Sequence, residues 1–253
     1  MAANNLLSEI GLDRYERNAR LKPALLFLAP VFATLWVMAQ PVFGTPGSVI
    51  ALLVAVGLPF FAAQVVRRSG QALERRWGDR IGREHSARLL DPADDTLSTH
   101  QKGRVIAFLN HYGPIMVERS VTAYSGAQNS SLRLTDIRWL LEVTRNDSDE
   151  SLLLNENISY GFWRNMRAIR TPAILLALAM PCLGAIMLFV DPLGINLTGL
   201  VAIAGLSGLS AVLWLTFATD AAVEDASLVF AERLFDQIDN PAVRKNIEGN
   251  SST

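Results

Sequence analysis

Two long stretches without ionised side chains constrain this chain more than any other feature of its sequence. Residues 23–66 contain no Asp, Glu, Lys or Arg, and residues 171–219 contain only Asp191. A helix rises about 1.5 Å per residue, so roughly 20 apolar residues cross the hydrocarbon core of a bilayer. Each stretch is long enough for two crossings, which excludes an ordinary soluble protein and predicts an integral membrane protein.

Turn-forming residues divide each stretch into two. Residues 40–47 (QPVFGTPG) hold two prolines and two glycines, and residues 191–196 (DPLGIN) combine Asp, Pro, Gly and Asn. We therefore expect an all-α integral membrane protein with four transmembrane helices, arranged as two hairpins that flank a helical cytosolic domain. The four spans are expected at residues 23–40, 49–66, 172–190 and 197–219.

The distribution of Lys and Arg predicts the orientation. Of the 23 basic residues, four lie in 1–22, sixteen in 67–171 and three in 220–253. Because basic segments stay on the cytoplasmic side, both termini and the middle segment are expected in the cytoplasm. The expected organisation is a cytosolic N-terminal arm (1–22), a first hairpin (23–66), a helical cytosolic domain (67–171), a second hairpin (172–219), and an acidic cytosolic helix and tail (220–253).

Helical periodicity dominates the middle segment. One amphipathic helix is indicated by apolar residues at positions i, i+3, i+4 and i+7, namely Val105, Phe108, Leu109 and Tyr112. A further helix is expected to start near Thr135 and Asp136. Residues 67–90 are expected to extend the second span as one polar helix.

The tail is expected to continue the fourth span. No helix breaker occurs between Leu209 and Asn240-Pro241, so one helix is expected to run from the membrane into the acidic segment. It would carry a narrow apolar stripe for docking, formed by Phe230, Leu234, Phe235 and Ile238. The last dozen residues are expected to be disordered.

Arginines concentrate beside the spans and have two interpretations. Residues 67–88 hold seven Arg and three acids, and residues 160–171 hold three Arg and no acid. They can simply hold the orientation and meet anionic headgroups. Alternatively, a symmetric homo-oligomer could gather them into a basic basin for a phosphate-bearing ligand, such as a cyclic nucleotide or a single-stranded oligonucleotide. The candidate ligand-binding residues are Arg76, Arg80, Arg83, Arg88 and Arg164.

The fourth span indicates close helix contacts or a pore. Thr198 and Gly205 belong to a face of small residues, which lets helices approach each other within one chain or between copies. In a ring of subunits this face could line a pore. Asp220 and Glu224, four residues apart, would then surround the cytoplasmic mouth and favour cations.

Enzymatic signals are few. Arg80 and Arg104 precede His85 and His111 by five and seven residues, spacings that resemble the motif of HEPN ribonucleases, but apolar residues follow both arginines. The residues Asp91, Asp94 and Asp95 fit an ordinary turn better than a cation site. We therefore expect no catalytic residue, no metal ligand and no cofactor, and a protein that is not an enzyme.

The overall plan resembles the small four-span effectors of bacterial anti-phage systems, which include CBASS-type membrane effectors and the Hailong membrane protein. The resemblance is carried by this architecture, by the Arg-rich segment 67–88 and by residues 157–165 (NISYGFWRN) before the third span. It implies a homo-oligomeric inner-membrane channel, gated by a nucleotide signal from a partner nucleotidyltransferase. Two alternatives stay open: a membrane-tethered HEPN-like ribonuclease, and a non-catalytic structural or partner-binding membrane subunit.

Overall fold

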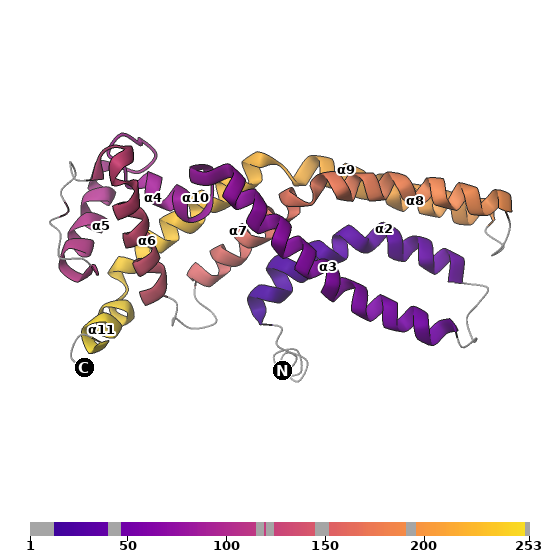
Figure 1. The fold of residues 1–253 in the computed structure, drawn as a ribbon, viewed down its shortest axis with the longest axis horizontal. Coiled ribbons are helices and arrows are strands. Elements are labelled where there is room, and N and C mark those ends of the chain that lie inside the picture. The colour runs from indigo at the N-terminus through magenta and orange to yellow at the C-terminus, as the bar shows by residue number, and fades with distance from the viewer. Residues whose placement is uncertain are drawn as a thin grey trace. The chain divides into compact units, whose positions relative to one another are not determined.

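Helices make up every regular element in the part of the chain that the structure describes (Figure 1). This part of the computed structural model comprises residues 13–39, 47–114, 119, 124–144, 152–190 and 196–250. The expectation of an all-helical fold is confirmed there. The turn expected at 40–47, except its last residue, and the turn expected at 191–196, except Asn196, lie outside the described residues.

Ten α-helices and four short helices of other types occur in the described residues. The α-helices are α2 (Lys22–Ala39), α3 (Gly47–Trp77), α4 (Gly82–Leu89), α5 (Thr99–Tyr112), α6 (Ser130–Val143), α7 (Leu152–Ala168), α8 (Arg170–Val190), α9 (Leu197–Phe217) and α10 (Asp220–Asp236). A further α-helix, α11 (Pro241–Asn250), follows near the C-terminus and brings the described number to ten. The short helices are the π-helix η1 (Glu16–Leu21) and the 3-10 helices η3 (Gly78–Arg80), η5 (Ala127–Asn129) and η6 (Gln237–Asp239).

Three helical segments are long and apolar enough to cross a membrane. They are Glu16–Val37, Arg170–Val190 and Leu197–Phe217. They contain most of the spans expected at 23–40, 172–190 and 197–219. The fourth expected span, 49–66, lies within α3, a helix of 31 residues, and its membrane crossing stays a prediction.

The chain divides into two compact units. The first unit combines Met1–Leu73 with Gly161–Ala222, and the second combines Glu74–Tyr160 with Val223–Thr253. The first unit therefore contains all three candidate spans. The second unit joins the middle of the sequence to the tail, so these two polar segments fold together rather than separately.

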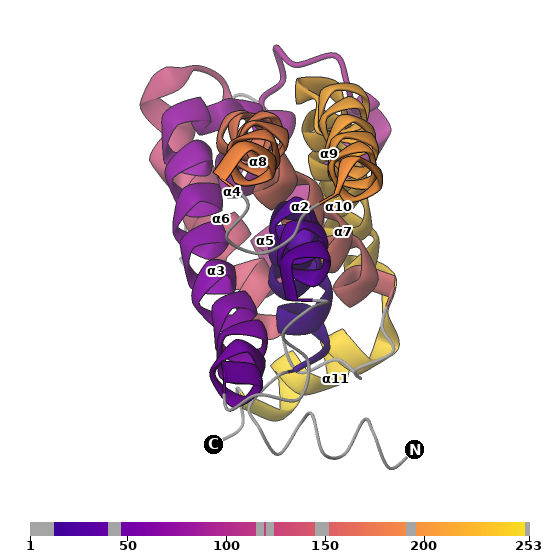
Figure 2. The same cartoon turned by 90° about the vertical axis from the view of Figure 1, so that its right-hand side faces the viewer.

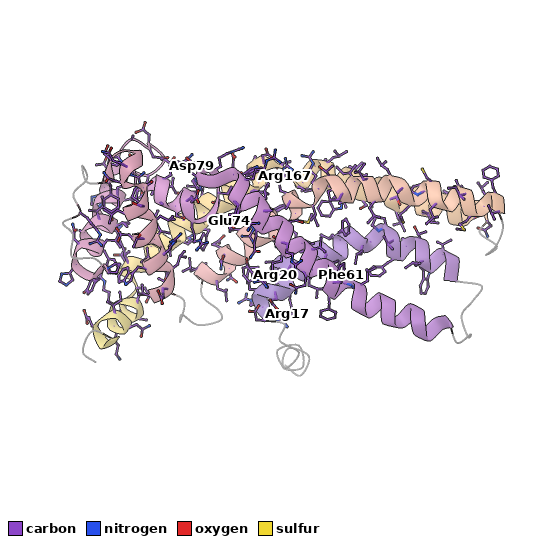
Figure 3. All side chains as sticks on the ribbon, viewed as in Figure 1. Arg17, Arg20, Phe61, Glu74, Asp79 and Arg167 are labelled. Carbon is purple, nitrogen blue, oxygen red and sulfur yellow. The ribbon has the colours of Figure 1, made fainter. Side chains whose placement is uncertain are left out.

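The first unit packs through small and apolar residues of five helices. Helix α2 lies beside both α8 and α9, which form a close antiparallel pair (Figure 2). The buried cluster consists of Ala24, Leu28, Ala62, Ala63, Val66, Met166, Ile169, Ala173, Trp214 and Ala218. Outside it, large apolar side chains remain exposed: Phe61 is 69% exposed and projects away from the ribbon, and Phe189 is 89% exposed (Figure 3). Exposed apolar surface on this scale is typical of a lipid-facing or partner-facing protein.

Small residues allow three helical segments of the first unit to cross closely. Asn165 on α7 donates from Nδ2 to the carbonyl oxygen of Ala19 in η1, at 2.6 Å. One turn earlier on α7, a Cβ added at Gly161 would lie 2.6 Å from the Tyr15 hydroxyl, and a Cβ added at Gly70 of α3 would collide with Asn165 Oδ1. Only glycine therefore fits at either position without displacing a neighbour. We call Ala19, Gly70, Gly161 and Asn165 the helix crossing.

The apolar stripe expected on the tail is confirmed. Phe230, Leu234, Phe235 and Ile238 are all at most 6% exposed, inside the second unit. The ring of Phe230 stacks on Tyr160 at a centroid distance of 6.0 Å. The stripe is thus the means by which α10 packs into this unit.

The expected disorder of the last dozen residues is wrong for most of them, because α11 continues to Asn250. Asn240 Oδ1 accepts a hydrogen bond from the Ala242 backbone at 3.0 Å, and proline at the first helical position needs no backbone donor. Val243 is 2% exposed, and the Tyr112 hydroxyl bonds to Glu248 at 3.0 Å. Burial and capping therefore order this segment.

The single polar helix expected over residues 67–90 is also wrong. Helix α3 ends at Trp77 and α4 begins at Gly82, with η3 between them. Gly78 and Gly82 adopt φ values of 56° and 71°, a backbone conformation that side chains other than glycine rarely adopt. Helix α6, likewise, starts at Ser130 instead of near Thr135.

A buried ion pair organises the second unit. Arg119 donates from Nε and Nη2 to the two carboxylate oxygens of Asp136, at 3.0 and 2.9 Å, and both side chains are at most 1% exposed. The Tyr124 hydroxyl also donates to Asp136, and burial beside that carboxylate raises the pKa of Tyr124. Arg133 in turn bonds to the Tyr124 carbonyl and pairs with Asp91 at 3.1 Å. Charge-assisted contacts thereby tie the segment before α6 to α6 itself.

Asp136→Asn is expected to destabilise the second unit by about 3–5 kcal/mol, because it removes the counter-charge of a buried guanidinium. Chemical unfolding of the full-length protein in detergent, followed by circular dichroism, would measure the change. Asp236→Asn serves as the control, since Asp236 pairs with Arg233 at 3.3 Å on the exposed side of α10. Equal effects of the two substitutions would contradict the role assigned to Asp136.

Candidate functional site

Helix α10 begins at a capped break directly after α9. The Thr219 hydroxyl accepts a hydrogen bond from the Ala222 backbone at 3.2 Å, which is a typical N-cap contact, and Asp220 occupies the favourable first turn. Ala218 departs from helical geometry with ψ 61°. The expected continuous helix through this point is therefore wrong. The break places the two candidate pore-mouth carboxylates at the start of a separate helix.

Asp220 pairs with an arginine at the end of α7. Arg167 donates from Nε to Asp220 Oδ1, and the two side chains are 26% and 46% exposed. Figure 3 shows Arg167 beside this part of the first unit. The contact links α7, which leads into α8, with the start of α10, which follows α9. Arg167, one of the arginines beside the spans that the sequence left open to two interpretations, thus has a specific carboxylate partner.

Glu224 pairs with Arg80 in the second unit. Arg80 Nε donates to Glu224 Oε1 at 2.9 Å, and Nη2 donates to the same oxygen. The guanidinium also lies over the Trp77 ring, 4.6 Å from its centroid. The two charged side chains are 48% and 39% exposed, so a solute can reach the pair. We call Arg80, Trp77 and Glu224 the Arg80 site.

The local backbone explains the position of Arg80. It closes the single turn η3, between the two glycines with positive φ, and Ile81 returns to extended geometry with φ −143° and ψ 158°. The Gly82 backbone then donates to Ser227 Oγ on α10, at 2.8 Å. This contact holds the turn against α10, one turn of helix beyond Glu224.

The other candidate basin residues have different surroundings. Arg88 pairs with Asp94 at 3.3 Å. Arg76 and Arg83 are exposed, and Arg164 is buried in the first unit. Arg80 and Arg88 therefore both pair with carboxylates of the same chain. A basin of all five arginines stays a prediction about an oligomer.

The candidate pore-lining residues of α9 are exposed in a single chain. Thr198 and Gly205 both lie on the exposed side, and a Cβ added at Gly205 would meet no atom within 4 Å. The opposite side of α9 buries Ile203, Ser207 and Ala211. Small side chains on the exposed side thus remain accessible for a contact outside this chain or for a pore.

The arginine and histidine pairs that resemble the HEPN motif are engaged elsewhere. Arg104 pairs with Asp239 of η6, as Arg80 pairs with Glu224. His85 is 5% exposed, with Nδ1 at 2.9 Å from Ser227 Oγ, while His111 is exposed and packs edge-on against Tyr112. Ser227 is fully buried, so a substrate cannot reach this serine–histidine pair. The arrangement favours a structural role for His85.

Several contacts of the site were not expected from the sequence. Thr219 follows an apolar span and precedes Asp220, a Thr-Asp signal that a capping rule could have identified. Ser227 and Trp77 carry no comparable local signal. The role of Ser227 depends on contacts with Gly82 and His85, which precede it by 145 and 142 residues in the sequence.

Stability is expected to fall as the pH drops from 7 to 5. Burial, and then the nearby charge of Arg88, lower the pKa of His85. Below about pH 6.5 the unfolded chain therefore takes up a proton that folded His85 binds only at lower pH. The contribution of neutral His85 to the stability of the folded protein is present above that pH. It is lost as the pH falls toward the pKa of His85 in the folded protein.

His85→Asn is expected to reduce this pH dependence, because asparagine does not titrate and its Oδ1 can still accept from Ser227. Thermal unfolding of the full-length protein across this pH range would measure it. His100→Asn, at an exposed position on α5, is the matched control. The explanation fails if both variants keep the wild-type slope.

Comparison with known proteins gives no match: no family model fits the chain, and neither a curated protein nor a solved structure is found to match it. The resemblance to anti-phage effectors therefore rests only on the order of expected spans and polar segments in the sequence. Any function has to be argued from the candidate spans, from the two arginine–carboxylate pairs at α10 and from the exposed side of α9.

Proposed function

We propose that the chain is a four-span protein of a bacterial inner membrane that assembles into a homo-oligomeric ion channel. Both termini and the second unit lie in the cytosol in this proposal. An anionic ligand with phosphate groups, a nucleotide or an oligonucleotide, controls opening at the Arg80 site. The observation that carries the proposal is the accessible ion pair between Arg80 and Glu224.

The membrane location is supported by the three apolar helices and by α3. Helix α3 contains the charge-free segment 49–66 and is long enough to cross a bilayer and extend beyond it. Arg67 and Arg68 follow that segment, and Arg167 and Arg170 lie next to α8. Basic residues at the ends of all these helices favour a cytosolic location for the segment between them.

The Arg80 site has the chemistry of an anion-responsive contact. A guanidinium recognises phosphate through planar, charge-assisted hydrogen bonds, and an incoming phosphate competes with a carboxylate for the same nitrogens. Trp77 restricts the guanidinium from one face. A ligand shifts a conformational equilibrium only when it binds one state more tightly than the other. A phosphate that binds Arg80 more tightly once Glu224 has dissociated therefore favours the state in which the Arg80–Glu224 pair is broken.

Release of Glu224 has a direct route to the candidate pore. Glu224 and Asp220 lie one turn apart on α10, and only Ala218 and Thr219 separate α10 from α9. While both carboxylates bind arginines, the start of α10 is held at two points. Loss of one contact allows α10 to move relative to its partners, and α9 is the helix that exposes Thr198 and Gly205. We place the gate at this joint.

In anti-phage defence, an open channel of this kind would depolarise the infected cell. This role follows the resemblance to four-span effectors described above. It also accounts for a ligand site that responds to phosphate, since such effectors are activated by nucleotide signals from a partner nucleotidyltransferase.

Breaking the Arg80–Glu224 pair is expected to raise ion flux in the absence of any ligand. Arg80→Ala and Glu224→Gln should both increase potassium efflux from liposomes that contain the full-length protein, by about three-fold or more. The loss of an exposed pair worth up to about 1 kcal/mol changes an equilibrium about five-fold. The charge exchange Arg80→Glu with Glu224→Arg should return efflux toward the wild-type value.

Arg233→Ala is the matched control, since it removes an exposed ion pair from the same helix. Its efflux should equal that of the wild type. The Arg80–Glu224 pair is ruled out as the contact that holds the channel closed if Arg80→Ala and Glu224→Gln both leave efflux unchanged. It is also ruled out if the charge-exchange variant shows the same efflux as the single variants.

The open channel is expected to prefer cations. A ring of Asp220 and Glu224 side chains, released from their arginines, concentrates cations at the cytoplasmic mouth. Reversal potentials in a potassium chloride gradient across planar bilayers should show cation selectivity, which Asp220→Asn combined with Glu224→Gln should reduce. Asp225→Asn, one residue beyond Glu224 on an exposed position, should leave it unchanged. Identical selectivity in all three proteins would remove these carboxylates from the pore.

A further inference from the structure

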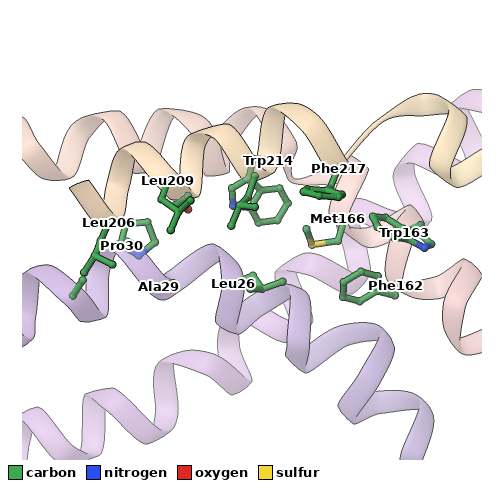
Figure 4. A pocket seen from close by; sticks show the side chains of 13 residues that line it. Leu26, Ala29, Pro30, Phe162, Trp163, Met166, Leu206, Leu209, Trp214 and Phe217 are labelled. Carbon is green, nitrogen blue, oxygen red and sulfur yellow. The ribbon is translucent and has the colours of Figure 1, made fainter. Parts of the chain in front are cut away.

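An apolar groove runs along the first unit between α2 and α9, and α7 closes one end (Figure 4). Its volume is about 360 Å³, within the range of about 300–1,000 Å³ that is usual for pockets that bind small ligands. Leu26 and Pro30 of α2, Trp163 and Met166 of α7, and Leu209 and Trp214 of α9 line it. Of its thirteen lining residues only Ser210 has a hydroxyl, so the groove suits a hydrocarbon ligand.

We propose that this groove binds one acyl chain of an anionic phospholipid, with the lipid phosphate at Lys22. This inference rests on the membrane location proposed above and is independent of the gating mechanism. The lipid would belong to the leaflet on the side of the N-terminal arm, the cytosolic one in that proposal. It would be a bound structural ligand, distinct from the phosphate-bearing signal at the Arg80 site.

The register of α2 supplies the charge complementarity. Leu26, Ala29, Pro30 and Ala33 line the groove at spacings of three and four residues. Lys22 precedes Leu26 by one turn and therefore lies on the same face of the helix, at the end where α2 begins. Its side chain is exposed. Lys22 thus lies one helical turn beyond the apolar lining of the groove. In a phospholipid the phosphate likewise lies just beyond the acyl chain, so the lysine can bind the phosphate while the groove holds the chain.

The length of the groove matches one leaflet. On α9 the lining of the groove extends from Leu206 to Phe217, a separation of eleven residues that corresponds to about 16 Å along a helix axis. Half of the hydrocarbon core of a bilayer is about 15 Å. A chain that starts with its phosphate at Lys22 would thus reach the far end of the groove near the middle of the bilayer. Trp163 lies at the opposite end of the groove from Pro30, which is the end proposed for the headgroup (Figure 4). Aromatic residues are common at that depth of a membrane.

The chemistry of the groove favours a lipid chain over a helix from a second copy. Its lining is apolar apart from the Ser210 hydroxyl and the indole nitrogens, and Lys22 lies in register with that lining, one turn beyond Leu26. A phospholipid has this order of a charged headgroup followed by a hydrocarbon chain. We therefore assign the groove to an acyl chain.

Quenching of tryptophan fluorescence by brominated lipids tests the proposal, because Trp163 and Trp214 line the groove. The full-length protein with Trp36→Phe would be used, since Trp36 is 61% exposed on α2 and would report on any lipid. Vesicles of phosphatidylcholine would contain increasing fractions of phosphatidylglycerol with dibrominated chains, or of equally brominated phosphatidylcholine. We expect half-maximal quenching at an about five-fold lower fraction of the anionic lipid, the effect of one lysine near a membrane surface.

Two substitutions separate the headgroup from the chain. Lys22→Gln should abolish the preference for phosphatidylglycerol and preserve quenching. Ala29→Phe, which fills the groove from an exposed position of its lining, should reduce quenching by both lipids. Ala179→Phe adds the same bulk on α8, at an exposed residue outside the groove, and should change neither.

Other outcomes overturn the inference. Equal quenching by the two lipids in the unsubstituted groove contradicts the phosphate contact at Lys22. The groove is assigned to a second copy of the chain if Ala29→Phe leaves the quenching unchanged but alters the oligomer mass in native mass spectrometry. Flotation with the vesicles separates the lipid site from the proposed membrane channel. A protein that floats and conducts ions, but shows no lipid preference, refutes the lipid site alone. A protein that does not float refutes the membrane location and the lipid site together.

Discussion

The hydrogen bond from Asn165 to the Ala19 carbonyl joins α7 to η1 within the first unit. Three helical segments approach each other there so closely that Gly70 and Gly161 leave no room for a Cβ. A π-helical turn such as η1 alters the spacing of backbone carbonyls, and here the Ala19 carbonyl accepts from a side chain of another helix. The chain leaves the first unit just after Gly70 and returns to it at Gly161.

The rest of the first unit follows from this helix crossing. Because Asn165 holds α7 against η1, Arg167 has a fixed position from which to bind Asp220, and Met166 and Trp163 form one end of the apolar groove. The candidate gate and the candidate lipid site therefore share α7.

Local signals in the sequence account for the spans and for the helical class. The absence of charge from 171–190 and 197–219 is sufficient to predict α8 and α9, because a continuous apolar run of about 20 residues is typical of a membrane helix, whereas a barrel strand is shorter and alternates apolar and polar residues. Glycine was a less clear signal. Gly78 follows the last residue of α3 and Gly82 is the first residue of α4, where periodicity alone predicts one continuous helix. Their effect depends on positive φ values, which a glycine in a sequence permits but does not require. The contacts of the Arg80 site have no local signal, because 144 residues separate Arg80 from Glu224.

Those long-range contacts change the meaning of the basic residues beside the spans. An arginine that only sets orientation needs no particular partner, since the membrane responds to charge and not to geometry. Arg80 instead has a stacked ring, two hydrogen bonds to one carboxylate oxygen and a glycine-determined turn that directs it. A lysine in its place would keep the charge but not this planar arrangement. The specificity of the contacts, more than the number of arginines, therefore favours a role in ligand response for Arg80 and a role in orientation for the exposed Arg76 and Arg83.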